Sequence, residues 1–170
     1  FGGTTRSDAV SFSISETGKG YLGTGWNGST YYKDFWEYDP ATDTWTQKAD
    51  FGGTARHSAV GLEISGKGYV GTGFNGSTRY KDFWEYDPNT NVWTQKRDFL
   101  GQARNGATGF SISGKGYVGT GFTGGYMVDF YEYNPSADTT LGSPWTQKAN
   151  FAGLNRAYAV GFSIDGKGYI

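Results

Sequence analysis

The side chains that carry out acid–base, nucleophilic or metal chemistry are scarce in this sequence. It contains one histidine, His57, and no cysteine. A Ser-His-Asp relay needs a histidine that an acid orients beside a nucleophile, and the adjacent Ser58 is expected to point to the opposite face of its strand. A zinc site needs several histidine, cysteine or acidic ligands. We therefore expect no catalytic residue, no metal and no cofactor.

The acidic residues also favour structural roles. Glu37, Glu85 and Glu132 stand at the same place in a repeated sequence, whereas a glycosidase needs two carboxylates with distinct roles. Asp39 and Asp43 lie among threonines without the glycine and glutamate of a calcium loop, which favours a capped turn over a Ca²⁺ site. The acidic residues therefore indicate neither an acid–base pair nor a calcium loop.

Two short motifs have a functional and a structural interpretation. The sequence Asn-Gly-Ser at 27–29 and 75–77 fits a glycosylation acceptor, but both copies occupy the same place in the repeat. Asn-Gly is also the strongest hairpin-turn dipeptide, so a turn is the favoured interpretation. The Gly-x-Gly sequences follow strands but open no helix, which excludes a dinucleotide-binding turn.

The elements that position these residues come from an internal repeat of about 50 residues. Four short sequences carry it: Phe-Gly-Gly-Thr, Gly-Lys-Gly-Tyr, Asp-Phe-Trp-Glu-Tyr and Trp-Thr-Gln-Lys. A period of this length is typical of a four-stranded propeller blade rather than of a helical solenoid. The expected repeats are 1–50, 51–98 and 99–150, followed by a partial fourth repeat at 151–170.

The second repeat shows how one blade is built. Short runs rich in β-branched and aromatic residues predict strands at about 59–64, 69–74, 82–86 and 92–96. The residues 65–68 predict the first turn, and Asp-Pro-Asn-Thr at 87–90 has the composition of a type I turn. Glycine supplies 29 of 170 residues and aromatic residues 18%, and no segment has helical periodicity. The fold class is therefore predicted to be all-β, built of antiparallel meanders.

Several repeated residues resemble the kelch motif. They are an arginine before the first strand, a glycine-rich end of the second, an aromatic third strand ending in Tyr-Asp-Pro or Tyr-Asn-Pro, and a tryptophan that opens the fourth. One departure is that the usual Gly-Gly pair is Thr-Gly, as in Gly71-Thr72-Gly73. The sequence is most similar to kelch domains of secreted or surface bacterial proteins. The resemblance implies a β-propeller, a fold shared by enzymes and binding proteins.

The length sets an expectation about the ring. Propellers close with 4 to 8 blades, and this chain holds about 3.4 repeats. We expect it to form part of a six- or seven-bladed ring that missing sequence or further copies complete. Galactose-oxidase-like kelch enzymes need a Cys–Tyr cross-link and histidine ligands, which these 170 residues do not contain.

Most repeated side chains are predicted to hold the blades together. The third-strand aromatic residues and Trp45, Trp93 and Trp145 are expected to pack between neighbouring sheets. The repeated arginines are expected to bond a carbonyl or carboxylate between blades, with the recurring glutamates as partners. These arginines are Arg6, Arg56, Arg104 and Arg156.

The non-repeated residues are better binding candidates, because packing does not require them to differ between repeats. In an up-and-down blade, the loops joining strands 2–3 and 4–1 emerge on one face. Aromatic and arginine side chains on loops above a rigid scaffold suit recognition of a peptide or a sugar. The candidates are Trp26, Tyr31, Tyr32, His57, Arg79, Tyr80, Tyr126 and Met127, with Asp8, Asn105 and Tyr158 nearby in the 4–1 loops.

Charge and hydropathy narrow the partner classes. The net charge is −1 with both signs spread along the chain, which disfavours nucleic-acid binding. No run of 18 apolar residues exists to insert into a bilayer, and no signal peptide is visible. We expect a binding or scaffold module for a protein, less so a glycan, that is secreted or at the cell surface. The alternatives are a sugar epimerase or mutarotase on a kelch propeller and a structural module of a larger surface assembly.

Overall fold

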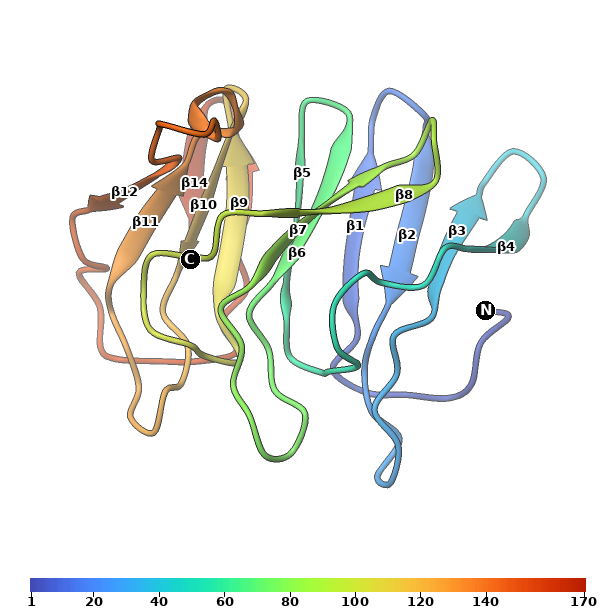
Figure 1. Cartoon of the computed structure of the whole chain (residues 1–170), viewed down its shortest axis with the longest axis horizontal. Helices are drawn as coiled ribbons and strands as arrows, with labels where there is room; N and C mark the ends of the chain where they lie inside the picture. The colour runs from blue at the N-terminus through green and yellow to red at the C-terminus, as the bar shows by residue number, and fades with distance from the viewer.

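A computed structural model describes residues 1–170 and is built from antiparallel sheets standing side by side (Figure 1). Three sheets have four strands each, in chain order, and a fourth has two. The strands are β1 (Val10–Ile14), β2 (Lys19–Gly23), β3 (Phe35–Asp39), β4 (Thr44–Lys48), β5 (Val60–Ile64), β6 (Lys67–Gly71), β7 (Phe83–Asp87), β8 (Val92–Lys96), β9 (Thr108–Ile112), β10 (Lys115–Gly119), β11 (Phe130–Tyr133), β12 (Trp145–Lys148), β13 (Phe162–Ile164) and β14 (Lys167–Tyr169). The all-β prediction and the meander are thus confirmed.

The second strand of the blade is shifted from its predicted place. Strand β6 covers Lys67–Gly71, whereas the sequence predicts 69–74. It begins earlier because the turn needs only Ser65 and Gly66, whose φ values of 50° and 78° suit a two-residue hairpin. It ends earlier because Thr72 and Gly73 have φ values of 60° and 100°, which an extended ladder cannot accommodate.

The Thr-Gly pair at this point explains how the sequence departs from the usual Gly-Gly. Thr72 takes a left-handed conformation that β-branched residues rarely adopt. Its hydroxyl lies 3.4 Å from the amide nitrogen of Val60 and accepts a hydrogen bond from it. The next amide, on Gly73, donates to the carbonyl oxygen of Arg104 in the following blade at 2.7 Å. The pair therefore ends one strand and joins two blades.

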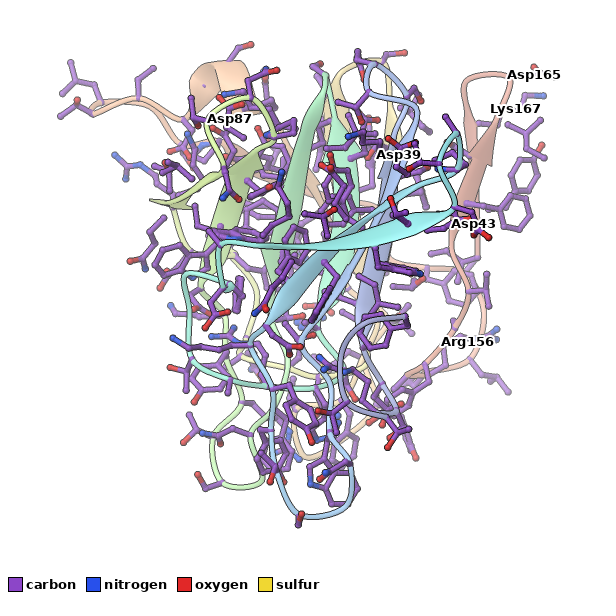
Figure 2. All side chains as sticks on the ribbon, turned by 90° about the vertical axis from the view of Figure 1, so that its right-hand side faces the viewer. Asp39, Asp43, Asp87, Arg156, Asp165 and Lys167 are labelled. Atoms are coloured by element: carbon purple, nitrogen blue, oxygen red, sulfur yellow. The ribbon has the colours of Figure 1, made fainter.

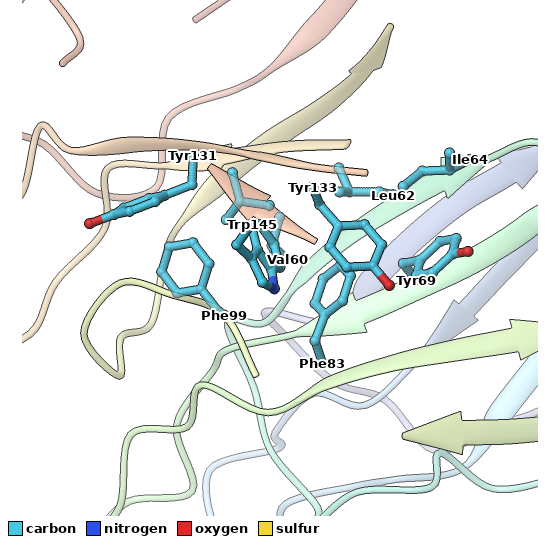
Figure 3. Packing of buried hydrophobic residues seen from close by; sticks show 10 residues of the cluster. Val60, Leu62, Ile64, Tyr69, Phe83, Phe99, Tyr131, Tyr133 and Trp145 are labelled. Carbon is cyan, nitrogen blue, oxygen red and sulfur yellow. The ribbon is translucent and has the colours of Figure 1, made fainter. Parts of the chain in front are cut away.

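The blades meet through their first strands and through aromatic side chains. Strand β5 contacts β1 on one side and β9 on the other, and β9 also contacts β13. Phe83 of the second blade packs edge-on against Tyr133 and Trp145 of the third, with ring centroids 4.9 and 5.1 Å apart (Figure 3). Phe35 of the first blade makes the same contacts with Tyr86 and Trp93 of the second. This is the inter-blade packing that the repeated aromatic residues predict.

Close approach between blades depends on glycine in the second strand. A Cβ at Gly68 would overlap the ring of Phe12 from the preceding blade. The equivalent Gly116 and Gly168 face Ile64 and Phe110 in the same way. Glycine here leaves room for a large side chain from the neighbour, which explains its recurrence.

The longer connection between β11 and β12 contains the 3-10 helix η1, Pro135–Ala137. It docks on the second blade, because the guanidinium group of Arg97 donates to the carbonyl oxygens of Thr139 and Thr140 at 3.1 and 3.0 Å. No helix of the structure is long and apolar enough to cross a membrane.

Candidate functional site

The loops that join the second and third strands project together from one end of the sheets, at the lower edge of Figure 1. Each is tied to the segment that enters the first strand of its own blade by a short antiparallel bridge. Phe74, for example, exchanges backbone hydrogen bonds of 2.9 and 3.0 Å with His57. The hairpin turns lie at the other end, where Figure 2 labels Asp39, Asp87 and Asp165 in its upper half. We call the end with the long loops the loop face.

The non-repeated side chains of the loop face form a row that crosses the three blades. We call this row the belt, and it consists of Trp26, Tyr31, His57, Phe74, Arg79, Asn105, Phe122 and Tyr126. The first blade contributes Trp26 and Tyr31. The second and third blades each contribute an aromatic residue, a variable residue five or four positions later, and a residue beside the repeated arginine. The sequence candidates omit Phe74 and Phe122 because they resemble repeated packing residues. Their alignment with Trp26 is the signal that identifies them.

The first part of the belt is a group of three stacked rings. The centroid of the His57 ring lies 5.8 Å from that of Trp26 and 5.5 Å from that of Tyr31, with interplanar angles of 30° and 24°. The side chain of His57 is 14% exposed. An open hollow of about 320 Å³ lies beside Trp26 and is lined also by Arg6 and Asn27. The single histidine therefore joins two blades, and Trp26, on which it stacks, borders a shallow surface depression.

The second part of the belt centres on Arg79. Its guanidinium carbon lies 5.1 Å from the centroid of Phe74 and 4.9 Å from that of Phe122. Its Nε donates to the side-chain oxygen of Asn105 at 2.9 Å, and the amide nitrogen of Asn105 donates to the hydroxyl of Tyr158 at 2.7 Å. The guanidinium group is thus fixed in position by residues of two blades.

Three of the sequence candidates lie beneath the belt. Tyr80 is half-buried, with its ring 4.0 Å from the guanidinium carbon of Arg56, and its hydroxyl accepts a 2.6 Å hydrogen bond from Asn75. Tyr32 makes the same contacts with Arg6 and Asn27 in the first blade. Met127 takes the equivalent place in the third blade, where its backbone amide bonds to Gly121 as those of the tyrosines bond to Gly25 and Gly73. The side-chain partners of Tyr32 and Tyr80 recur with the repeat, whereas the sulfur of Met127 accepts from the hydroxyl of Thr123 at 3.5 Å.

The repeated arginines pair with aspartates rather than with the glutamates that the sequence predicts. Arg56 is fully buried, and its two Nη atoms reach the carboxylate oxygens of Asp82 at 2.5 and 2.8 Å. It also donates to the carbonyl oxygens of Thr54 and Thr72. We call this arrangement the latch. It recurs as Arg6 with Asp34 and Arg104 with Asp129.

The prediction of glutamate partners is wrong for a geometric reason. Asp82 directly precedes β7 at the loop-face end, where Arg56 also lies, whereas Glu85 is inside the strand opposite Tyr69. The latch also closes within one blade, not between blades. Arg156 bonds the carbonyl oxygen of Leu154 and lies 4.6 Å from the ring centroid of Phe151, with no carboxylate within 4.0 Å.

The recurring glutamates sit in a second network at mid-blade. The carboxylate of Glu132 accepts from Lys115 at 2.8 Å and from the hydroxyl of Tyr117 at 2.9 Å, and Lys148 lies 3.2 Å away. The hydrogen bond from Lys115 is the main cause that lowers the pKa of Glu132 to about 2, and burial opposes it. Burial, with the glutamate partner Glu37, raises the pKa of Tyr21 to about 12. A carboxylate so firmly ionised is unsuited to act as a general acid at neutral pH.

Ser58 lies beside the ring of His57, contrary to the expectation from the sequence. The hydroxyl of Ser58 lies 2.8 Å from His57 Nδ1, on the same side rather than on the opposite face. The cause is the φ of 53° at Ser58, which interrupts the alternation of an extended chain. Asp8 lies 3.5 Å from the same nitrogen. A relay needs the acid and the nucleophile on different ring nitrogens, so these three residues do not form one.

The turn acids contact their own turn. Asp39 accepts from the amide of Ala41 at 2.9 Å, and Asp43 accepts from the hydroxyl of Tyr38 at 2.9 Å. The structure contains no group of three or more histidine, cysteine, aspartate or glutamate side chains placed to hold a metal ion.

The Asn-Gly-Ser sequences form turns in which the side-chain oxygens of Asn27 and Asn75 accept from the backbone amides of Thr30 and Thr78.

Comparisons with known proteins bear on the repeat. Residues 25–52 match the family model described as the kelch motif. The structure of YjhT is similar along 98% of this chain, with a TM-score of 0.75 and 20% sequence identity. The chain spans 58% of the length of that structure. A search of the curated proteins found no match.

The matched segment runs from the end of β2 through the loop face, β3 and β4 to the start of the next repeat. The second and third blades repeat its strand order and the latch aspartate, and the second blade repeats its aromatic contacts with the following blade. The motif at residues 25–52, its repetition along the chain and the fold together support a kelch-repeat β-propeller.

Proposed function

We propose that these blades form a non-catalytic binding or scaffold module whose loop face engages a protein partner. The observation that carries the proposal is the belt, a row of mostly aromatic side chains with Arg79 among them, most of which are partly exposed and which differ between blades. Tyrosine, tryptophan and arginine dominate the energetics of protein interfaces. Because equivalent positions are not identical in the three blades, with Tyr31, Arg79 and Tyr126 at one of them, the belt offers the asymmetry that specific recognition requires.

The scaffold beneath the belt supports this proposal. The bridges between His57 and Phe74, and the latch below them, fix the loops to the strands. A partner therefore meets side chains whose positions are already set, which reduces the entropy lost on binding. Tyr126 is 57% exposed and is available for contact without rearrangement.

Other functions use the same face differently. A glycan stacked on Trp26 and Tyr31 is the second binding candidate, because aromatic rings next to polar groups suit sugars. A sugar epimerase or mutarotase needs acid and base groups on different sides of its substrate, and Asp8 is the exposed acid closest to His57. A structural module of a larger surface assembly is a further alternative, and a secreted or cell-surface location is part of the proposal.

A paired set of variants tests the proposal. The double variant Trp26→Ala/Tyr126→Ala removes two belt rings, and Glu16→Ala changes an exposed residue of the β1–β2 turn at the opposite end. Pull-down from the native host, followed by titration of the captured protein, should show a partner that the double variant loses and the Glu16 variant keeps. Sugar turnover that Asp8→Asn abolishes would instead establish the enzyme, and unchanged capture by the double variant would exclude the loop face.

A further inference from the structure

Arg79 is a charged belt side chain with unused hydrogen-bond donors. We propose that Arg79 binds a carboxylate on the partner, namely an aspartate or glutamate side chain within an acidic segment of a protein. The inference rests on the proposed function and names the chemistry of the partner. It starts from a difference between this arginine and those of the latch.

The guanidinium group of Arg79 is held in position before any ligand arrives. Its guanidinium carbon lies over the ring of Phe74 of its own blade and over the ring of Phe122 of the next. Its Nε is fixed by Asn105, a side chain that is 5% exposed and is itself held by Tyr158. Stacking and one hydrogen bond therefore set the plane of the fork, so little side-chain entropy remains to be lost on binding.

The two terminal nitrogens of this fork have no partner in the protein. The hydrogen bonds of Arg79 comprise the single one from Nε, and no carboxylate lies within 4.0 Å of its nitrogens. In contrast, Arg56 and Arg104 each place both Nη atoms on an aspartate. The Nη atoms of Arg79 are absent from the set of buried polar atoms without partners, so they reach solvent. They are oriented donors available to an incoming group.

The geometry matches a carboxylate. Two parallel N–H donors in one plane bind the two oxygens of a carboxylate in bidentate fashion, as the latch shows three times in this chain. A phosphate would fit the same fork, but nucleic acid is disfavoured by a net charge of −1 with both signs spread along the chain. An acidic side chain of a protein is the source that agrees with the surrounding aromatic belt.

Packing alone does not explain why position 79 is an arginine. The equivalent residues are Tyr31 in the first blade, whose ring stacks on Trp26, and Tyr126 in the third, whose ring contacts Phe122 at a tilt of 57°. A neutral ring therefore meets the packing requirement at the other two copies. The guanidinium group adds a positive charge and free donors, which packing does not use.

The test uses the whole chain and variants taken from its own repeat. Arg79→Tyr installs the residue of the sibling blades, and Arg79→Lys keeps the charge but removes the planar fork. The probe is an acetylated peptide of alternating glycine and glutamate, and its control has glutamine in place of glutamate. Binding is measured by calorimetry and by the NMR resonance of the Arg79 Nε–H group, with glucuronate and glucose as a separate pair of ligands.

We expect the acidic peptide to bind at least about tenfold more tightly than its glutamine control, with the Nε–H resonance shifted. Arg79→Tyr should remove that preference and Arg79→Lys should reduce it, while melting temperatures stay close to the parent. Equal binding of the two peptides, no binding at millimolar concentration, or full affinity in Arg79→Tyr would overturn the inference. Glucuronate bound through Arg79 without the peptide would also overturn it, because the source would then be an acidic sugar.

These outcomes separate this inference from the proposed function. A protein partner that is lost in Trp26→Ala/Tyr126→Ala but kept in Arg79→Tyr would retain the loop face and reject the carboxylate. If every variant still captured the partner, the loop face would not be the binding surface. Raising the salt concentration should weaken the binding of the acidic peptide, because salt screens a partly exposed charge pair. The binding of the glutamine control should not change.

Discussion

The latch and the belt each hold an arginine next to aromatic rings, but only the latch satisfies its hydrogen-bond donors within the protein. In the latch, Arg56 is buried and its donors are satisfied by Asp82, Thr54 and Thr72. In the belt, Arg79 is half-exposed and two of its nitrogens remain free. An arginine between aromatic rings is therefore structural or available for binding according to whether a carboxylate lies within its own blade.

The two regions also differ in how they vary along the chain. The latch is the same arginine–aspartate pair in all three full blades, whereas the belt changes from Tyr31 to Arg79 to Tyr126. The latch residues have equivalent neighbours in all three blades, so the same residue types are required in each. A residue that faces outward has no such constraint. The comparison predicts large stability effects for the latch and small ones for the belt.

The largest effect is expected from opening the latch in the second blade. Asp82→Ala leaves the guanidinium group of Arg56 buried without a counter-charge, which costs about 3–5 kcal/mol of unfolding free energy. Arg56→Met also lowers the melting temperature, but less, because it removes the buried charge and leaves Asp82 with some access to water. Urea unfolding followed by tryptophan fluorescence measures both.

The control for this prediction is a neighbouring ion pair. Lys81 and Asp98 lie 4.0 Å apart and are both about half exposed, so Asp98→Ala should change the stability by less than about 1 kcal/mol. If Asp82→Ala and Asp98→Ala proved equally mild, the latch would not hold the blade, and the comparison with the belt would lose its basis.

An intermediate, pH-dependent effect is expected from the mid-blade glutamate network. The pKa of Glu132 is lowered to about 2 from its ordinary 4.5, so the folded state gains stability above pH 4.5 and loses that gain as the pH falls toward 2. Glu132→Gln should cost about 1.5–3 kcal/mol at pH 7, the usual range for hydrogen bonds to a charged group. The difference from the parent should shrink through that acid window.

Glu16 provides the matched control for the acid experiment. It is exposed in the β1–β2 turn and makes no ion pair. Glu16→Gln should leave the pH profile of unfolding unchanged. A stability difference for Glu132→Gln that stayed constant from pH 7 to pH 2 would mean that packing, and not charge, explains the role of Glu132.

The sequence predicts the blade well because each strand and turn is encoded locally and repeated. Residues 65–68 predict the hairpin, and the aromatic residues predict the packing between Phe83 and Trp145. The bounds of β6 require the φ values at Thr72 and Gly73, which residue type alone does not give, since threonine rarely adopts a left-handed conformation. The number of blades in the closed ring stays a prediction.

The candidate site is predicted less completely, because its contacts join residues from different blades. Both Asp82 and Glu85 recur, and choosing the partner of Arg56 requires knowing which end of the blade each occupies. Cross-strand pairing could have indicated the correct partner, because Glu85 lies opposite Tyr69 inside the β6–β7 ladder and so away from Arg56. The contact of Arg79 with Phe122 depends on how closely two blades approach, which no local pattern specifies.

The smallest stability effect is expected from the belt itself. Arg79→Tyr exchanges two partly exposed cation–π contacts for ring stacking of the kind that Tyr31 makes, and we expect a change of about 1 kcal/mol or less. What cost there is should come from the side-chain oxygen of Asn105, which loses its donor. Adding Asn105→His recreates the Tyr31–His57 pair, which joins the first and second blades, and should recover that loss. A drop as large as that of Asp82→Ala, with no recovery in the double variant, would show that Arg79 holds the blades together as the latch does, and that its free donors are incidental.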